Sequence, residues 1–225
     1  SPILRRVLAS AARLQEVVPD AVLVGGSAAA LHAGHRDSVD HDHVLTDLVN
    51  RYETVLEAVE ATEGWATSVR ASRPPFTIMG SLWGVEAGLR QLRRRRPLET
   101  CRVEVGGGAV VIAPTVAETL RVKAFLVVQR NVVRDYLDVV ALADHIGTKA
   151  AVAVLAGIDE YYVDRSGETG SVLTSLVIAL ADPRPRDPEV IGELPRYKGL
   201  KPRYHGWEAI VEVCRSLALG LSGAA

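Results

Sequence analysis

The sequence predicts an α/β protein of the α+β kind, in which strands and helices mix first and helices alone follow. Short apolar runs separated by glycine-rich turns fill the first half of the chain. The second half carries longer segments whose apolar residues recur at helical spacing. Because strands come first and helices later, we expect an α/β lobe over residues 1–113 and a helical lobe over 114–225.

The composition is that of a globular chain with a proper core. The 225 residues are 48% hydrophobic and carry a net charge of -1. This balance excludes a wholly basic nucleic-acid coat, so such contacts must come from local patches. The cysteines, Cys101 and Cys214, show no CxxC spacing, which argues against a disulfide framework or a zinc site and suits a reducing cytoplasm.

The N-terminal residues read as neither a signal peptide nor a membrane anchor. No apolar stretch reaches the length of a membrane span. We therefore expect a cytoplasmic protein without membrane contact.

The first half begins with an amphipathic helix over 2–18, which Pro19-Asp20 ends. A buried strand at 21–24 and a helix of small residues at 27–33 should follow, with Gly34 ending that helix. The further expected elements are a strand at 40–44, a helix at 48–62, and strands at 65–69, 76–79, 83–89, 101–105 and 110–113. The last two strands should form a hairpin around three glycines.

The second half should be helical. Thr115 is placed to N-cap a helix at 116–128, and Glu118 would complete a capping box. Further helices are expected at 132–145, 149–158, 171–181 and 207–219, with a proline-rich linker at 182–188.

The most informative stretch joins a glycine turn to a pair of carboxylates. Gly25-Gly26-Ser27 follows a strand and opens a helix, so its backbone N–H groups suit an anion. Asp40 and Asp42 share one strand face, about 7 Å apart along the strand. Two such carboxylates repel each other unless a cation lies between them. Mg²⁺ prefers oxygen ligands and shares them with phosphates, so the stretch indicates a phosphate site beside a metal site.

Residues 24–42, VGGSAAALHAGHRDSVDHD, resemble the nucleotidyltransferase signature of the DNA polymerase β superfamily. Within it they most resemble the AbiEii / MenT group of toxins from type IV toxin–antitoxin systems. The resemblance continues at Lys123 and at Arg134-Asp135-Tyr136-Leu137-Asp138. It is good over 21–45 and 110–145 and poor over 60–100 and beyond 150. It implies a polymerase-β-like lobe with a mixed β-sheet, followed by a C-terminal helical lobe.

The resemblance implies that Asp40 and Asp42 hold Mg²⁺, with Mn²⁺ as an alternative. A third carboxylate from another strand should join them, and Glu86 is the candidate, with Glu104 as the alternative. The residues expected to bind the nucleotide are Gly25, Gly26, Ser27, Arg36 and Lys123.

Lys123 and Asp138 are expected to be catalytic by the same resemblance, together with Asp40 and Asp42. The residues leave a second interpretation open, because a salt bridge that holds Lys123 or Arg130 in place fits the sequence equally well.

Two histidines occupy positions on the aspartate strand where the family has apolar residues. We expect His41 and His43 to be buried with hydrogen-bond partners. Metal ligation by a histidine, which would shift preference toward Mn²⁺ or Zn²⁺, is the alternative.

Basic residues form two groups, the second interleaved with aromatic residues, and both are candidates for RNA contact. They are Arg93, Arg94 and Arg95, and then Arg196, Lys198, Lys201 and Arg203. Ser38 is a candidate regulatory residue, since a phosphate there would compete with the NTP for the metal.

The function implied by the resemblance is that of a Mg²⁺-dependent nucleotidyltransferase toxin. It would transfer NMP from an NTP to the 3′ end of tRNA and inhibit translation and growth, with a separately encoded antitoxin protein as its partner. Two alternatives remain: an adenylyltransferase that acts on an antibiotic or a protein, and a catalytically degenerate NTP-binding module. The arginines at 90–96 argue against an aminoglycoside acceptor.

Overall fold

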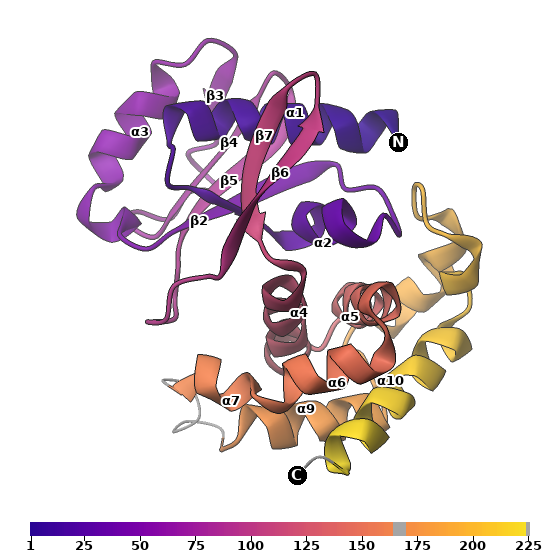
Figure 1. Cartoon of the computed structure of the whole chain (residues 1–225). Coiled ribbons are helices and arrows are strands. Elements are labelled where there is room, and N and C mark those ends of the chain that lie inside the picture. Colours follow the sequence, from indigo (N-terminus) through magenta and orange to yellow (C-terminus); the bar gives the residue numbers. More distant parts are fainter. Residues whose placement is uncertain (164–169, 224–225) are drawn as a thin grey trace. The chain divides into compact units, whose positions relative to one another are not determined.

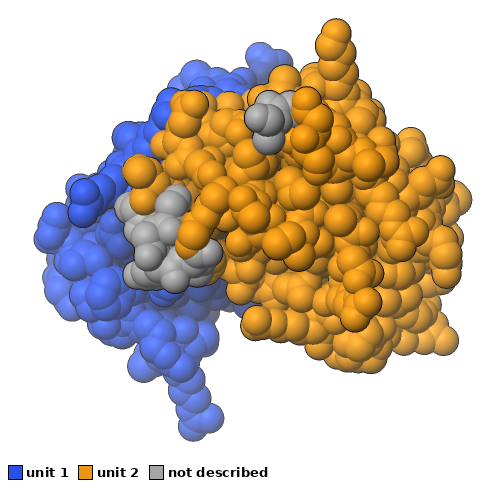
Figure 2. Space-filling view, turned by 90° about the horizontal axis from the view of Figure 1, so that it is seen from below, with its two compact units in different colours: residues 1–28, 37–115 blue, residues 29–36, 116–225 orange. Residues whose placement is uncertain are grey.

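The computed structural model describes residues 1–163 and 170–223 (Figure 1). Contacts divide the chain into two compact units, which Figure 2 distinguishes by colour. Unit 1 comprises residues 1–28 and 37–115, and unit 2 comprises 29–36 and 116–225. The chain therefore passes between the units three times, whereas the sequence suggested a single boundary at 113/114.

A mixed five-stranded sheet forms the centre of unit 1, in the order β1-β2-β5-β4-β3. β2 pairs with β5 in parallel, and the other neighbours are antiparallel. A separate hairpin pairs β6 with β7. The strands are β1 (Val22–Val24), β2 (Asp40–Leu45), β3 (Trp65–Thr67), β4 (Thr77–Leu82), β5 (Val85–Gln91), β6 (Thr100–Gly106) and β7 (Ala109–Pro114).

Helices α1 (Pro2–Val17) and α3 (Tyr52–Glu60) contribute to the core of unit 1 with the sheet (Figure 1). Leu14 of α1 and Val55 of α3 are buried together with Ile78 and Leu89 of the sheet. The expected helix at 48–62 is divided into a 3₁₀ turn, η1 (Leu48–Asn50), and α3. Helix α2 (Gly25–Ala33) begins in unit 1 and ends in unit 2.

Unit 2 is helical and is built around α5 (Val133–Ile146), most of whose residues are buried. Helices α4, α6 and α10 pack against α5. The other elements of unit 2 are α4 (Val116–Arg130), α6 (Thr148–Ala156), α7 (Ile158–Tyr161), α9 (Val172–Ala181), η2 (Pro188–Arg196), η3 (Pro202–Tyr204) and α10 (Trp207–Ser222). The α+β class with a mixed sheet and a helical C-terminal part is therefore confirmed. The 3₁₀ elements η2 and η3 were not predicted. Prolines at 188, 195 and 202 interrupt any α-helical pattern between residues 188 and 204.

Among the described residues, no single helix is both long and apolar enough to cross a membrane. In the part of the chain that the structure describes, α5 and α6 taken together are the one pair that reaches the required length and composition, and the chain bends by 117° between them.

Candidate active site

The two predicted metal carboxylates lie side by side on one face of β2. Burial alternates strictly along this strand, so Asp40 and Asp42 are half-buried while His41 and His43 are fully buried on the opposite face. The alternation follows from the strand geometry, in which successive side chains point to opposite faces. The two aspartates therefore share one strand face and the histidines lie on the other, while metal binding by the aspartates remains a prediction.

The glycine turn lies directly beside the Asp42 carboxylate. Val24 pairs with Asp42 across β1 and β2, so the next residue, Gly25, comes close to that side chain. A Cβ atom on Gly25 would lie 3.6 Å from Asp42 Oδ2, and the φ of Gly25 is +74°, which favours glycine. The hydroxyl of Ser27 donates to the backbone oxygen of Asp40. These contacts bring the first turn of α2 to the carboxylates, and the N–H groups of a helix's first turn have no partner within the helix itself.

Strand β5 supplies the other wall of a small polar pocket, of about 50 Å³, around the two aspartates. Glu86 pairs with Asp40 and Gly88 pairs with Asp42. A Cβ atom on Gly88 would lie only 2.4 Å from Asp42 Oδ1, so glycine is required there if the carboxylate is to keep its place. Sequence reasoning did not identify Gly88, although it lies two residues after the candidate Glu86 and hence on the same face.

The third carboxylate is not assembled into a ready metal site. Glu86 lines the pocket but is exposed. Glu104 lies on β6 in the two-stranded sheet and does not line the pocket. In the part of the chain that the structure describes, no group of three or more His, Cys, Asp or Glu side chains is arranged to hold a metal ion.

Arg90 is a residue of this site that the sequence did not reveal. It follows Gly88 by two positions on β5, and its Nε lies 3.2 Å from Asp42 Oδ1. Its side chain is 46% exposed, whereas that of Asp42 is 32% exposed. The contact shows that Asp42 pairs with a cationic group on this face. The register of β2 against β5, which brings positions 42 and 90 together, is not readable from the sequence.

Ser38 contacts the first aspartate. Its hydroxyl donates to Asp40 Oδ1 over 3.0 Å, and the residue is only 3% exposed. The geometry gives Ser38 a part in orienting Asp40, while its burial leaves the hydroxyl little exposed to a modifying enzyme. Its regulatory role remains a prediction.

The two histidines differ in their hydrogen bonding. His41 Nε2 lies 3.0 Å from the Ser10 hydroxyl of α1, whereas neither ring nitrogen of His43 has a hydrogen-bond partner among the residues that the structure describes. Burial lowers the pKa of His41 to about 4, although Asp40 opposes the shift. Burial also lowers the pKa of His43 well below its ordinary value, and His41 adds to that effect. Both are therefore neutral side chains of the core; the expected hydrogen-bond partner exists for His41 and is missing for His43.

The other predicted residues meet in unit 2, in a buried charge cluster around Asp138. Lys123 Nζ lies 2.7 Å from Asp138 Oδ2, and His35 Nε2 lies 2.7 Å from Oδ1. Arg36 donates to both oxygens, over 2.9 Å from Nε and 3.1 Å from Nη2. Helix α5 presents Asp138, α4 presents Lys123, and the residues after α2 present the other two.

Asp135 extends the cluster by one helical turn. Arg130 pairs with it over 2.7 Å and 3.0 Å, and Lys123 Nζ lies 3.7 Å from Asp135 Oδ1. Lys123 is only 4% exposed and is engaged by both aspartates. Of the two interpretations of Lys123, the salt bridge is the one that the geometry displays; the catalytic and nucleotide-binding roles of Lys123, Asp138 and Arg36 remain predictions.

The cluster is electrostatically self-consistent. Burial alone would raise the pKa of Asp138, but the charges of Arg36 and Lys123 and the hydrogen bond from His35 hold that pKa well below its ordinary value. Burial lowers the pKa of His35, although the hydrogen bond to Asp138 opposes this. Asp138 is therefore an ionised carboxylate that several donors hold in place.

The basic residues chosen from the sequence differ in accessibility. In unit 1, Arg93 and Arg95 are exposed, but Arg94 is 7% exposed and its guanidinium donates to the backbone oxygens of Arg96 and Pro97. Arg94 therefore shapes the β5–β6 connection, and the exposed neighbours remain the candidates for RNA contact.

The basic residues in unit 2 lie along the segment that carries η2 and η3. Arg196 pairs with Glu193, Arg203 pairs with Asp144, and Lys201 Nζ donates to the backbone oxygen of Ala33 at the end of α2. Lys198 is exposed. Much of this charge has an intramolecular partner, and its role in RNA contact remains a prediction.

Comparison with solved structures identifies the fold. A Helicobacter pylori protein classed as a nucleotidyltransferase superimposes with a TM-score of 0.51 and 13% sequence identity, over 98% of this chain and 96% of that protein. The chain therefore has a nucleotidyltransferase-like fold. It matches no known protein family profile.

Comparison with curated sequences gives relatives of a different description. The heme uptake protein MmpL11 of Mycobacterium tuberculosis is 31% identical in an alignment, gaps included, of 243 positions that covers 96% of this chain. The mycolic acid-containing lipids exporter MmpL11 of Mycolicibacterium smegmatis is 35% identical over 130 residues, or 58% of this chain and 13% of that protein. The chain spans about a fifth of the length of the tuberculosis relative, 22%.

Proposed function

We propose that the chain is a nucleotidyltransferase that transfers NMP from an NTP to a polynucleotide acceptor, specifically the 3′ end of tRNA. The observation that supports this most directly is the position of Gly25, whose backbone lies against the Asp42 carboxylate at the start of α2. An anion-binding helix start beside a carboxylate pair is what transfer from a metal-bound triphosphate requires.

The residues on β2 fit a divalent cation that is shared with a substrate. Mg²⁺ is commonly held through one or two carboxylates plus substrate phosphates, and Asp40 and Asp42 supply two carboxylates on one open face. Asp40 and Asp42 would hold Mg²⁺, or Mn²⁺ in its place, with Glu86 as a further ligand. The bound ion would neutralise phosphate charge and activate the attacking oxygen.

The chain's own residues would position the reactants. N–H groups at Gly25, Gly26 and Ser27 would orient the triphosphate, and Ser38 would hold Asp40 in place. An acceptor hydroxyl oxygen then forms a bond to the α-phosphorus. The bond from that phosphorus to the bridging oxygen breaks, pyrophosphate leaves with the electron pair, and the hydroxyl proton passes to water.

A toxin of the AbiEii / MenT kind is the biological role that the motif at 24–42 supports. Modification of tRNA 3′ ends in the cytoplasm would inhibit translation and growth, and a cognate antitoxin protein would neutralise it.

The direct test is incubation of the protein with each labelled NTP, Mg²⁺ and total tRNA, followed by gel separation. We expect label on tRNA, and we expect Asp42→Asn to reduce it by at least about 10²-fold, because the substitution removes the charge and keeps the shape. Asp182→Asn, which changes an exposed aspartate of unit 2, is the matched control and should retain full transfer.

Other outcomes of this experiment separate the alternatives. Label on a protein or an added aminoglycoside instead of RNA would indicate an adenylyltransferase for those acceptors. Transfer that survives Asp42→Asn would contradict the assignment of the active site.

A second candidate function is a nucleotide-binding module without transfer. Two observations favour it: Arg90 already pairs with Asp42, and most of the chain is similar to a segment of transport proteins much longer than itself. In this case the domain would bind an NTP as part of a larger protein concerned with transport. Equilibrium binding of labelled NTP without label transfer to any acceptor would support this candidate over the first.

A further inference from the structure

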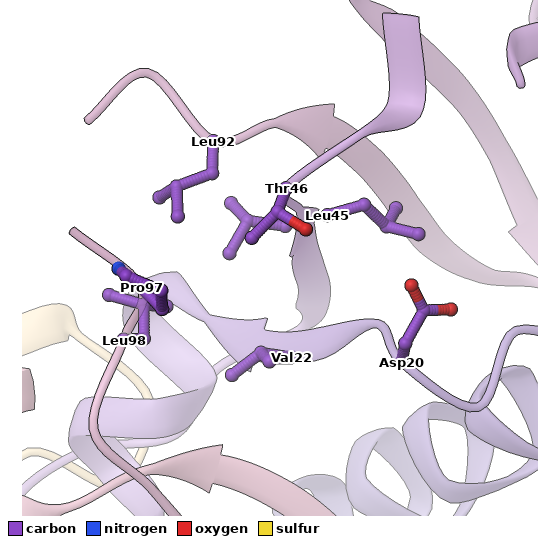
Figure 3. A pocket seen from close by; sticks show the side chains of 8 residues that line it. Asp20, Val22, Leu45, Thr46, Leu92, Pro97 and Leu98 are labelled. Atoms are coloured by element: carbon purple, nitrogen blue, oxygen red, sulfur yellow. The ribbon is translucent and has the colours of Figure 1, made fainter. Parts of the chain in front are cut away.

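A second pocket, of about 90 Å³, lies in unit 1 on the same sheet as the carboxylates (Figure 3). Val22 and Val44, which pair across β1 and β2, form its floor. Leu92 and Leu98 come from the connection between β5 and β6 and form an apolar wall. None of the residues assigned to the carboxylate site lines it.

The rim of this pocket is polar. Figure 3 shows the Asp20 carboxylate and the Thr46 hydroxyl at its edge. One Asp20 oxygen is paired with Arg51, and a carboxylate retains further lone pairs for other donors. Apolar walls with a few polar groups at the edge are typical of sites for planar organic groups.

The pocket continues the carboxylate face along β2. Ser27 contacts Asp40, Gly25 lies beside Asp42, and the pocket begins at Val44. Val44 is two residues beyond Asp42, which places the floor about 7 Å away along the strand. The phosphate-binding turn and this pocket therefore lie toward opposite ends of β2 relative to Asp42.

The glycine turn and the pocket lie toward opposite ends of β2, and this order indicates which reactant binds at each end of the strand. In phosphoryl transfer the attacking and leaving oxygens are roughly in line on opposite sides of the phosphorus. If pyrophosphate leaves toward the start of α2, the acceptor approaches from the side of Val44. The pocket is thus on the acceptor's side of the reaction.

The charge around the pocket favours a polyanion. Arg93 and Arg95 are exposed in the segment between the wall residues Leu92 and Leu98. Arginines beside an apolar slot suit a nucleic-acid strand, whose phosphates they contact while a base enters the slot.

We propose that this pocket is the acceptor subsite and receives the terminal nucleobase of a polynucleotide. The inference rests on the proposed transferase function. Asp20 accepts a hydrogen bond from the base, which favours adenine, the terminal base of a tRNA 3′ end, whose amino group is a donor, over uracil, whose single N–H lies between two carbonyl groups.

Direct binding tests the pocket without requiring transfer. The probe is a short 5′-fluorescent oligoribonucleotide ending in A or U, and the measurement is fluorescence anisotropy with the intact protein. Leu98→Trp, which fills the slot, should weaken binding about tenfold or more. Leu219→Trp, at an exposed leucine of α10, is the matched control and should leave binding unchanged.

The terminal base provides an independent measurement. We expect the wild-type chain to prefer a 3′ adenine over a 3′ uracil by about fivefold or more, and Asp20→Asn should abolish this preference. Circular dichroism confirms that each variant is folded. Unchanged RNA binding by folded Leu98→Trp, or a preference that Asp20→Asn does not alter, would overturn the proposal.

Kinetic measurements distinguish a base of the RNA from the base of the NTP as the occupant of the pocket. They also test the pocket separately from the transferase function. If transfer occurs, Leu98→Trp should raise the KM for the RNA and leave the KM for the NTP unchanged. A higher KM for the NTP alone would place the NTP base in the pocket and overturn the assignment of the pocket to the acceptor. If wild-type protein transfers nothing yet its RNA binding depends on Leu98 and Asp20, the transferase function fails while the nucleobase pocket is supported.

Discussion

At the scale of single residues, the site combines predictable and unpredictable contacts. Asp40 and Asp42 were predictable as a pair, because alternation along a strand depends only on local geometry. Arg90 was not, because its contact with Asp42 depends on how two strands 48 positions apart align. Lys123 shows a third situation: the sequence permitted both a substrate contact and a salt bridge, and only the packing of α4 against α5 displays the salt bridge.

His43 offers a prediction at this scale, because within residues 1–163 and 170–223 neither nitrogen of its buried ring finds a hydrogen-bond partner. His43→Leu should increase the free energy of unfolding by about 1–3 kcal/mol near neutral pH, since an unpaired polar group is replaced by an apolar one of similar volume. Urea-induced unfolding of the wild type and of His43→Leu measures the difference in their free energies of unfolding.

The same substitution should change the response to acid. The pKa of His43 is lowered in the folded state, so the unfolded state binds the proton first as the pH falls below 6.5, and stability is lost over that range. The variant should lose less stability than wild type, although His41, with a pKa of about 4, still contributes. A variant that is less stable at neutral pH and equally acid-sensitive would contradict the role assigned to this ring.

At the scale of elements, the sequence predicted most helices and strands but not how their edges are covered. Apolar spacing located α1, α4, α5 and β2 to within a few residues. The backbone groups on the edge of β7 are hydrogen-bonded by a single side chain of α1. The sequence pattern could not predict this contact, because it depends on how α1 packs beside β7. Gln15 of α1 donates to the backbone oxygen of Ile112 over 2.8 Å and accepts from its N–H over 2.7 Å.

Gln15→Leu should therefore destabilise the protein by about 1–3 kcal/mol, because it leaves a backbone donor and acceptor of β7 without their partner. The side chain is 7% exposed, so water replaces it poorly. Chemical denaturation provides the measurement, and Gln129→Leu on the exposed face of α4 provides the comparison. Equal stability of the two variants would show that the α1–β7 link contributes little.

At the scale of the whole molecule, the two units have separate cores but are not separate stretches of sequence. Ala29–Arg36 lies early in the chain and belongs to unit 2. Arg36 provides two of the hydrogen bonds that satisfy Asp138. The motif that reads as one continuous signature from 24 to 42 therefore contributes a glycine turn to unit 1 and a charge cluster to unit 2. A sequence motif does not reveal this division, because the signature gives order along the chain and not the contacts of each residue.

Arg36→Met tests this division. The substitution removes one positive charge and two hydrogen bonds from buried Asp138, which keeps Lys123 and His35, so the cost should approach but not exceed the roughly 3–5 kcal/mol typical of a fully broken buried ion pair. Asp138 lies on α5, the central helix of unit 2, so unit 2 should lose stability. This is expected although Arg36 itself lies between α2 and β2 in the sequence. Hydrogen exchange should show faster exchange of α4 and α5 amides, with little change in β4 and β5. Arg13→Met, which removes an exposed pair with Glu16, should change neither set. Equally faster amide exchange in both units would show that they unfold as one cooperative body. Exchange of α5 amides at the wild-type rate would show that Lys123 and His35 suffice to hold Asp138.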